Sequence, residues 1–258
     1  MKIMNDIPFE IDSDEVFEIL HLTAEHRYAG EVRALIDKAR EFARPRAVYD
    51  VAFVEERETD AVVLAGESQP QNSMRPGEEP ARARFVSRVL RANLDEVERV
   101  FPYVVTCGQE LDSISIGDDE MFRQFCWDSI KEAVLYAAIE SLSDHLKETF
   151  ALEKLVSMNP GSGEIEVWPI EQQKGLFSFF GDVQQLIGVT LTNSCVMIPS
   201  KSVSGIFYSS EHDFQTCQLC RRENCSHRSA PFDPHMWEMK LGGKAGDRKG
   251  TESGDVVE

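Results

Sequence analysis

One long apolar stripe limits the possible folds of this 258-residue chain more than any other feature. Between residues 119 and 150, apolar side chains recur at every fourth position, and no proline or glycine interrupts them. This spacing places them on one face of an α-helix. The sequence therefore predicts a long, mostly buried helix over 119–150. Its stripe consists of Phe122, Cys126, Ile130, Val134, Ala138, Leu142 and Leu146.

Shorter patterns on both sides of this helix predict a mixture of helices and strands. Segments rich in Gly and Pro at 66–79 and 158–169 are expected to be loops. Further helices are predicted at 13–22, 29–42, 83–90, 94–100 and 171–180, and strands at 47–53, 61–64, 102–106, 184–192, 196–199 and 203–209.

Composition restricts the partners. The chain has 45 acidic and 27 basic side chains, a formal net charge of −18, so it repels phosphate backbones and we expect no nucleic-acid binding. No apolar run approaches the roughly 20 residues that span a bilayer, and the N-terminus has no signal-type apolar core. We therefore expect no membrane partner and a cytoplasmic location. The 42% of hydrophobic residues is enough for a real core.

The chain is expected to form one domain over residues 1–238. From about residue 240 the sequence is Gly-rich and nearly free of apolar side chains. The sequence therefore predicts a disordered tail at 239–258.

Three cysteines close together near the end of the domain indicate a metal site. Cys217, Cys220 and Cys225 have the spacing C-x2-C-x4-C, and a C-x2-C pair grips one metal ion with little strain. A fourth ligand would come from His227, from a distant cysteine or from outside the protein. Spacing alone leaves zinc and an iron–sulfur cluster open. The alternative is three reduced thiols in a surface loop.

The basic side chains of this segment would offset the negative charge of metal-bound thiolates. They are Arg221, Arg222 and Arg228. Of the other cysteines, Cys107 and Cys126 are most simply core residues. Cys195 is the best candidate for a fourth ligand, although core packing explains it equally well.

An ordered set of short motifs resembles the activation domain of cobalamin-dependent methionine synthase. The resemblance is specific over residues 160–208. It begins with a Gly/Pro loop and a short helix, and continues with Ile187-Gly188, Leu191-Thr192, Ser194, Met197, Pro199 and the run Ser202-Val203-Ser204-Gly205. Upstream, the long helix at 119–150 fits the same family. The resemblance leaves out the cysteine segment and the tail.

The resemblance implies an α/β (α+β) fold, a C-shaped domain with a central twisted, largely antiparallel sheet flanked by helices. In that family the domain binds S-adenosylmethionine and docks on a cobalamin domain whose cobalt has been oxidised. It implies a corrinoid protein as partner, which supplies the cobalamin, and an electron-donor protein as a second partner. The cofactor-binding candidates carried over are Gly161, Ser162, Trp168, Thr192, Ser194 and Lys201.

The cofactor loop departs from the family pattern R-x-x-x-G-Y. Gly161 is kept, but Ser157 stands at the Arg position and Ser162 at the Tyr position. A hydroxyl does not replace the guanidinium fork that pairs with the methionyl carboxylate, which argues against S-adenosylmethionine binding. Lys201 is a candidate for a substitute cation.

Three functions remain open from the sequence. The first is an accessory protein of a corrinoid methyltransferase system that supports reductive reactivation of cobalt, with an iron–sulfur cluster. The second is a non-catalytic module that binds a corrinoid protein and is pinned by structural zinc. The third is an S-adenosylmethionine-dependent reactivation domain. No catalytic residue is predicted, because the sequence contains no G-x-S-x-G, H-E-x-x-H or P-loop motif.

Overall fold

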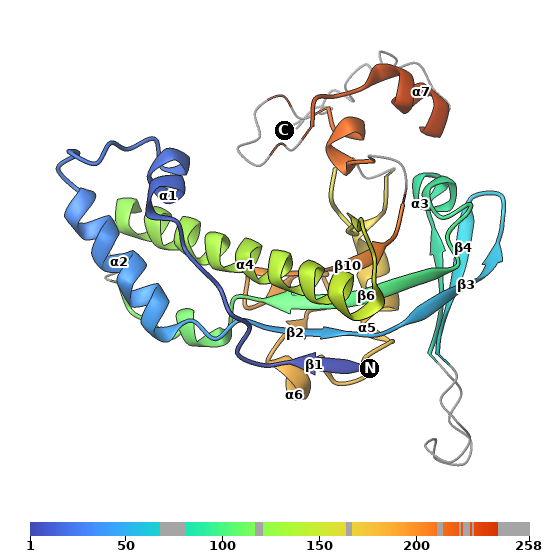
Figure 1. Ribbon diagram of the computed structural model, residues 1–258, viewed down its shortest axis with the longest axis horizontal. Helices are drawn as coiled ribbons and strands as arrows, with labels where there is room; N and C mark the ends of the chain where they lie inside the picture. The colour runs from blue at the N-terminus through green and yellow to red at the C-terminus, as the bar shows by residue number, and fades with distance from the viewer. Residues whose placement is uncertain are drawn as a thin grey trace, which may run out of the picture.

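The computed structural model describes residues 1–67, 81–116, 121–163, 167–210, 214–221, 223, 228 and 230–241. Within these residues, helices cover both faces of one antiparallel sheet, whose strands do not follow one another in chain order (Figure 1). No helix among them is both long and apolar enough to cross a membrane.

Strand β6 (Arg99–Thr106) is the centre of the sheet. It pairs along its length with β10 (Ser202–Tyr208) on one edge. On its other edge it pairs first with β3 (Ala52–Arg57) and then with β2 (Arg46–Tyr49). The predicted single strand at 47–53 is therefore two strands, which meet β6 at different places. All these pairings are antiparallel.

The remaining strands extend the sheet on both sides. The order β1-β2-β6-β3-β4-β5 forms one path, and β7 joins through β10. In Figure 1, β3 and β4 run steeply across the direction of β2 and β6, so the sheet is strongly twisted. The added strands are β1 (Lys2–Met4), β4 (Ala61–Gly66), β5 (Arg82–Val86) and β7 (Val156–Met158), and β8 (Thr190–Leu191) with β9 (Met197–Ile198) forms a separate hairpin.

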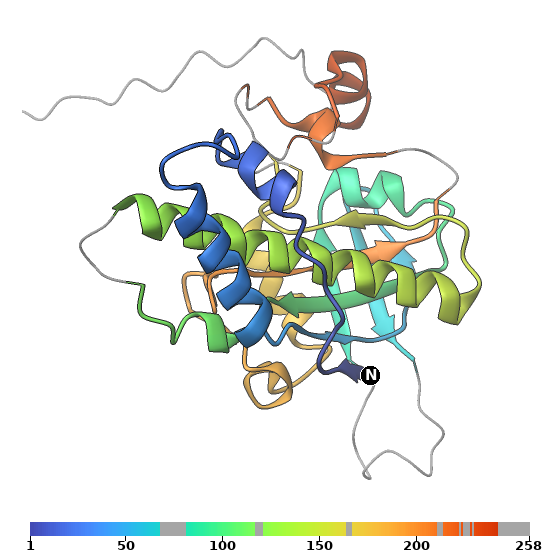
Figure 2. The ribbon, with the colours of Figure 1, turned by 60° about the vertical axis from the view of Figure 1, so that its left-hand side comes forward.

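Alternation along β6 divides the core into two layers. Phe101, Tyr103 and Val105 point into one apolar cluster, and Val100 and Val104 into the other. Figure 2 shows the first face covered by the three helices α1 (Ser13–Ile19), α2 (Ala29–Phe42) and α4 (Met121–Phe150). The second cluster takes side chains from α3 (Arg88–Asn93), α5 (Gln173–Phe177), α6 (Val183–Ile187) and α7 (Pro234–Leu241).

The long predicted helix is confirmed as α4. Six of its seven stripe residues are buried, and Phe122 is partly buried against the same cluster. The helix also buries Lys131, whose ammonium pairs with Asp112 at 3.1 Å and with Asp128 at 2.9 Å. The expected antiparallel sheet flanked by helices is likewise present.

The helices predicted at 83–90 and 94–100 are wrong. The first region is the edge strand β5 followed by the short helix α3, and the second leads into β6. Along β5, buried Ala83 and Phe85 alternate with exposed Arg82 and Arg84. The ladder of backbone hydrogen bonds with β4 and the burial of Ala83 and Phe85 outweigh the local helical spacing. The exposed arginines pair with Glu55 and Glu58.

The strand predicted at 184–192 is wrong over its first half, which belongs to helix α6, and only Thr190–Leu191 form a strand, β8. The side chain of Asp182 accepts a hydrogen bond from the Gln185 amide at 3.1 Å, which caps the helix start. Gly188 ends the helix in a left-handed conformation with φ of 78°. Two local caps thus select a helix in a segment rich in β-forming side chains.

Three other expectations differ in extent. The helix predicted at 171–180 is a 3-10 turn (Ile170–Gln172) followed by the short helix α5. Helix α7 continues to Leu241, inside the segment expected to be a tail, and residues 242–258 lie outside the described part of the chain. Most of the loop expected at 66–79 also lies outside it.

Candidate functional site

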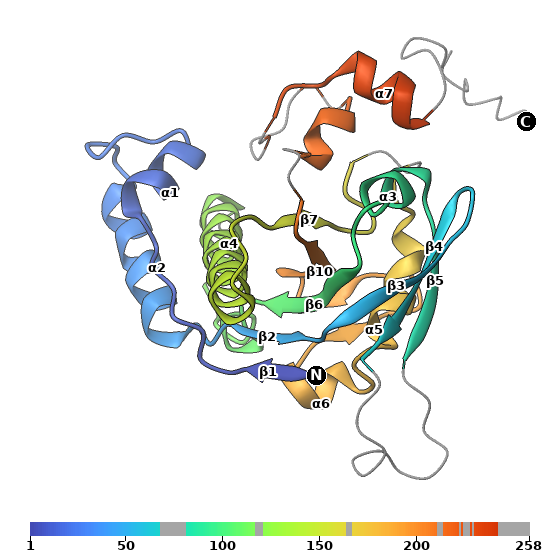
Figure 3. The ribbon, with the colours of Figure 1, turned by 45° about the vertical axis from the view of Figure 1, so that its right-hand side comes forward.

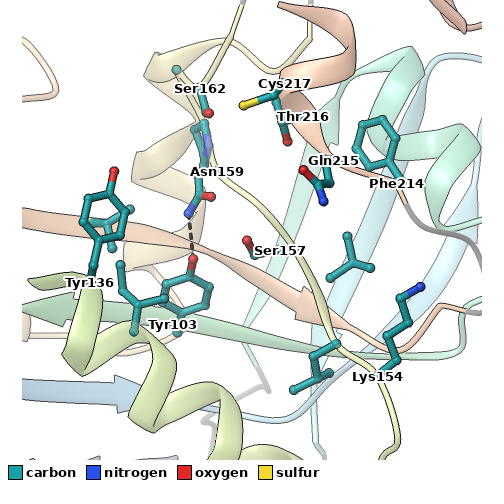
Figure 4. Close-up of a pocket in the computed structure, with 16 residues that line it drawn as sticks. Tyr103, Tyr136, Lys154, Ser157, Asn159, Ser162, Phe214, Gln215, Thr216 and Cys217 are labelled. Atoms are coloured by element: carbon teal, nitrogen blue, oxygen red, sulfur yellow. Dashed lines mark hydrogen bonds between the residues drawn. The ribbon is translucent and has the colours of Figure 1, made fainter. Parts of the chain in front are cut away.

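A cavity of about 600 Å³ opens between α4, the loop after β7, β10 and the start of the cysteine segment. Figure 4 shows that its walls come from four separate parts of the chain. Tyr136 extends from α4, and Phe214 and Cys217 from the cysteine segment. Tyr103 lies on the floor, on the central strand β6.

The loop after β7 is shaped by a type II turn over residues 159–162. The Ser162 amide donates to the Asn159 carbonyl at 3.1 Å, with Pro160 and Gly161 between them. Gly161 has φ of 79°, which a side chain disfavours, and a Cβ there would also press on Ile170. The sequence Asn-Pro-Gly-Ser therefore specifies the turn that brings Ser162 to the cavity.

The turn is anchored to the floor by the side chain of Asn159. Its Nδ2 donates to Tyr103 Oη at 2.7 Å and to the Ser204 carbonyl at 2.9 Å. Burial raises the pKa of Tyr103 to about 12, although hydrogen bonds with Asn159 and Ser157 act in the opposite direction. The Tyr103 hydroxyl is therefore neutral at physiological pH and serves as a fixed polar group in the floor.

Gly205 makes room for this anchor. A Cβ at Gly205 would lie 2.6 Å from the Met158 carbonyl oxygen and 3.0 Å from Tyr103 Oη, and it would collide with Asn159 Nδ2. The glycine of the Ser-Val-Ser-Gly motif is thus required because the loop backbone passes directly over the strand.

The cavity differs in charge from the rest of the protein. Lys154 is charged, and no carboxylate occurs among the described lining residues. The other polar groups are hydroxyls, amides and one thiol, from Tyr103, Tyr136, Ser157, Asn159, Ser162, Gln215, Thr216 and Cys217. In a chain with a net charge of −18, this lining favours a ligand that is neutral or carries an anionic group.

Trp168 lies in the core beneath the loop. It is fully buried, and its ring meets Phe85 edge to face at 5.5 Å between centroids. Its carbonyl accepts a hydrogen bond from the Gly161 amide at 2.8 Å. The backbone of Trp168 therefore positions Gly161 of the cofactor loop. The Trp168 side chain is absent from the described cavity lining.

The three other carried-over candidates lie around the β8–β9 hairpin. Thr192 and Ser194 form a hydroxyl–hydroxyl contact of 3.1 Å, and Thr192 Oγ1 also accepts from the Val196 amide at 3.0 Å. Lys201 pairs with Glu132 of α4 at 3.0 Å. None of the three carried-over candidates belongs to the described lining of the 600 Å³ cavity, and each has a local structural partner.

The cysteine segment forms the upper wall of the cavity through a 3-10 turn, η3 (Thr216–Leu219). Cys217 lies in the turn with its sulfur directed toward the side of Ser162 (Figure 4), and Cys220 ends the turn. Arg228 donates to the Cys217 carbonyl at 3.3 Å and to the Cys220 carbonyl at 3.2 Å. Its guanidinium therefore holds both cysteines in one turn.

The described residues include only part of the predicted metal site. Cys225, Arg222 and His227 lie outside the described residues. Within the described ones, no group of three His, Cys, Asp or Glu side chains is arranged to hold a metal ion, so Cys195 does not complete a site with Cys217 and Cys220.

The remaining cysteines are buried. Cys107 and Cys126 belong to the core cluster beneath α4. Burial raises the pKa of Cys107 to about 12 and that of Cys126 to about 11, so both thiols stay protonated. Cys195 is buried in the β8–β9 turn with φ of 62°.

Most lining residues were not identified from the sequence, among them Tyr103, Tyr136, Lys154, Asn159 and Phe214. They lie on elements far apart in the chain. Asn159 carried the clearest signal, since it begins the Asn-Pro-Gly-Ser turn. Tyr103 reads in sequence as one more apolar residue of a buried strand.

We predict that Gly205→Ala lowers the free energy of unfolding by about 1–3 kcal/mol, because the new methyl group displaces Asn159 from the floor. Urea denaturation measures the change. Gly30 of α2 is a matched control, since a Cβ there meets no atom within 4 Å. Gly30→Ala should be neutral or stabilise by up to about 1 kcal/mol. Equal stability of the Gly205 variant and the wild type would contradict the anchor.

Comparison with known proteins supports the fold. No protein-family model matches the sequence, and no curated protein does. Among solved structures, the crystal structure of the MetH reactivation domain bound to AdoHcy matches with a TM-score of 0.54 and 15% identity. The match covers 95% of this chain and 91% of that chain. The chain therefore has a methionine synthase reactivation-domain-like fold.

Proposed function

We propose that this chain is a cytoplasmic accessory protein of a corrinoid-dependent methyltransferase system, which docks on a corrinoid protein and supports reductive reactivation of its cobalt. The observation that carries the proposal is the cavity between the Asn-Pro-Gly-Ser loop and the cysteine turn, in a chain that shares its fold with a reactivation domain over nearly its whole length. The corrinoid belongs to the partner.

The rim of the cavity supplies the contact surface in this proposal. Tyr136 of α4 is 47% exposed although it lines the cavity, so its ring is available to a partner. Large, partly exposed aromatic side chains beside a concave surface are typical contact residues of protein interfaces. The floor around Tyr103 is neutral, and no carboxylate among the described lining residues would repel an anionic group.

The cysteine turn supplies a metal centre in the same proposal. Cys217 and Cys220 lie in one short turn whose carbonyls are held by Arg228, and Cys225 follows as the third thiolate. The guanidinium offsets thiolate charge and fixes the turn. An iron–sulfur cluster on these thiolates would supply single electrons at the wall of the docking cavity.

We predict that the chain accelerates reduction of Co(II) to Co(I) in the corrinoid subunit of a methyltransferase. Titanium(III) citrate provides the electron, and the absorbance of Co(I) follows the reaction. Tyr136→Ala should weaken the effect about 10-fold, because it removes a central aromatic contact. Phe42→Ala is the control, since Phe42 is a similarly exposed aromatic residue outside the cavity. No acceleration, or equal loss in both variants, would refute docking through this face.

Metal analysis tests the cysteine turn separately. Protein purified without oxygen should contain iron and acid-labile sulfide, with charge-transfer absorption that dithionite bleaches. Cys220→Ala should lose this metal, whereas Cys126→Ala, in the core, should keep it. Zinc without sulfide would instead favour the non-catalytic module pinned by a structural ion. Unchanged metal content in Cys220→Ala would remove the turn as a ligand set.

A second candidate function is S-adenosylmethionine-dependent reactivation. Two observations favour it: the cofactor-loop turn with Gly161 faces the cavity, and the similar solved domain is bound to AdoHcy. Ser157, at the family's Arg position, also lines the cavity. Because Ser157 carries no guanidinium, Lys154 is the basic side chain among the described residues that line the cavity.

Calorimetry with AdoHcy tests this second function. We predict weak binding by the wild type and binding at least about 10-fold tighter by Ser157→Arg, because the new guanidinium pairs with the ligand carboxylate in two hydrogen bonds. Ser178→Arg, an exposed change at the end of α5 and outside the described cavity lining, should bind like the wild type. Failure of Ser157→Arg to bind AdoHcy would exclude the family's cofactor subsite in this chain.

A further inference from the structure

A second cavity lies where α7 packs against α3, on the other side of Phe214 from the proposed docking cavity. It has a volume of about 320 Å³ and is bounded by α3, the end of β10 and α7. Figure 3 shows α7 above α3, and the two helices are in contact. Phe214 is a wall of both this cavity and the larger one.

Lys240 brings a positive charge to this cavity. Its ammonium donates to Asn93 Oδ1 and lies 5.0 Å from the centre of the Phe214 ring. Among the described residues, no carboxylate pairs with it. Burial lowers the pKa of Lys240, as expected for a partly desolvated ammonium. A partly buried cation of this kind favours the binding of an anion, because the anion offsets the cost of desolvating the charge.

Tyr208 brings an unused hydrogen-bond donor to the same space. The side chain is 1% exposed, and its hydroxyl forms no hydrogen bond of ordinary geometry with the described residues. Asn93 is a polar neighbour of this hydroxyl and gives it at most a poorly aligned hydrogen bond, because Asn93 Oδ1 accepts from Lys240 and Asn93 Nδ2 lies 3.2 Å from Met158 Sδ. Buried hydroxyls in native proteins are normally paired, so a free one in a cavity wall indicates a missing acceptor.

Apart from Asn93 and Ser210, the rest of the described wall is apolar. Ala92, Phe214 and Met236 line it, and the volume lies at the lower end of the range for small-molecule sites. A suitable ligand therefore has a small apolar body and one anionic acceptor group. A carboxylate fits both requirements, because its two oxygens can accept from an ammonium and a hydroxyl at once.

We propose that the cavity between α3, β10 and α7 binds a small organic carboxylate, whose oxygens accept from Lys240 and Tyr208 and whose apolar body contacts Phe214 and Met236. Such a ligand compensates the buried cation and fills the space under α7. Because Phe214 is shared, an occupied second cavity also fixes one wall of the docking cavity.

Calorimetry on the full chain tests the proposal, with benzoate as the probe and benzyl alcohol as its uncharged analogue. Benzoate should bind at one site and more tightly than benzyl alcohol. Lys240→Met should weaken benzoate binding at least about 10-fold and leave benzyl alcohol nearly unchanged, since the charge-assisted bond is lost. Tyr208→Phe should weaken it several-fold. Lys174→Met, an exposed lysine on α5, should bind benzoate like the wild type.

Docking of α7 is checked by tryptophan fluorescence, because Trp237 is 4% exposed in this helix and becomes exposed if the helix detaches, whereas Trp127 and Trp168 lie in other parts of the core. An unchanged emission spectrum in Lys240→Met, together with lost benzoate binding, supports the site. The proposal is overturned if wild-type protein shows no benzoate binding, if benzyl alcohol binds equally well, or if Lys240→Met leaves benzoate affinity unchanged.

Discussion

Everything in this structure depends on β6, a strand that is buried on both faces and hydrogen-bonded along both edges. Its alternate side chains enter two different apolar clusters, so one strand holds the α4 layer and the α5–α6 layer together. A strand with this position cannot slip in register without exposing both cores. The same strand places Tyr103 at the cavity floor, so the position of the floor is as firmly determined as the core itself.

The cavity is a consequence of how a loop is held above this strand. Asn159 fastens the turn to Tyr103 and to β10 from the cavity side. The Trp168 carbonyl fastens Gly161 from the core side. Two attachments from opposite sides leave the loop little freedom, which is the arrangement that a preformed binding site requires. Gly205 permits it, because a side chain there would occupy the space of the Asn159 amide.

Positive charge is placed sparingly in this acidic chain, and its positions are informative. Arg228 holds the carbonyls of the cysteine turn, Lys154 lines the first cavity and Lys240 reaches into the second. By contrast, Lys131 and Lys201 are compensated by carboxylates on or near α4. Lys131 and Lys201 stabilise the fold through these pairs, whereas the cations that line a cavity are the ones that we propose to meet a ligand or partner.

Local sequence by itself determined the long helix α4, the bounds of α2 and the turn at Asn-Pro-Gly-Ser, because periodicity and turn chemistry act over a few residues. It also singled out Gly161, Ser162 and Cys217, which the structure brings to one cavity. It mistook β5 for a helix and α6 for a strand, because cross-strand pairing and end caps decided those segments. Only the tertiary structure showed Trp168 in the core and Thr192 and Ser194 in a hairpin. Only it brought Tyr103, Asn159 and Phe214 together, since contacts between distant segments are set by packing and leave no local pattern to read.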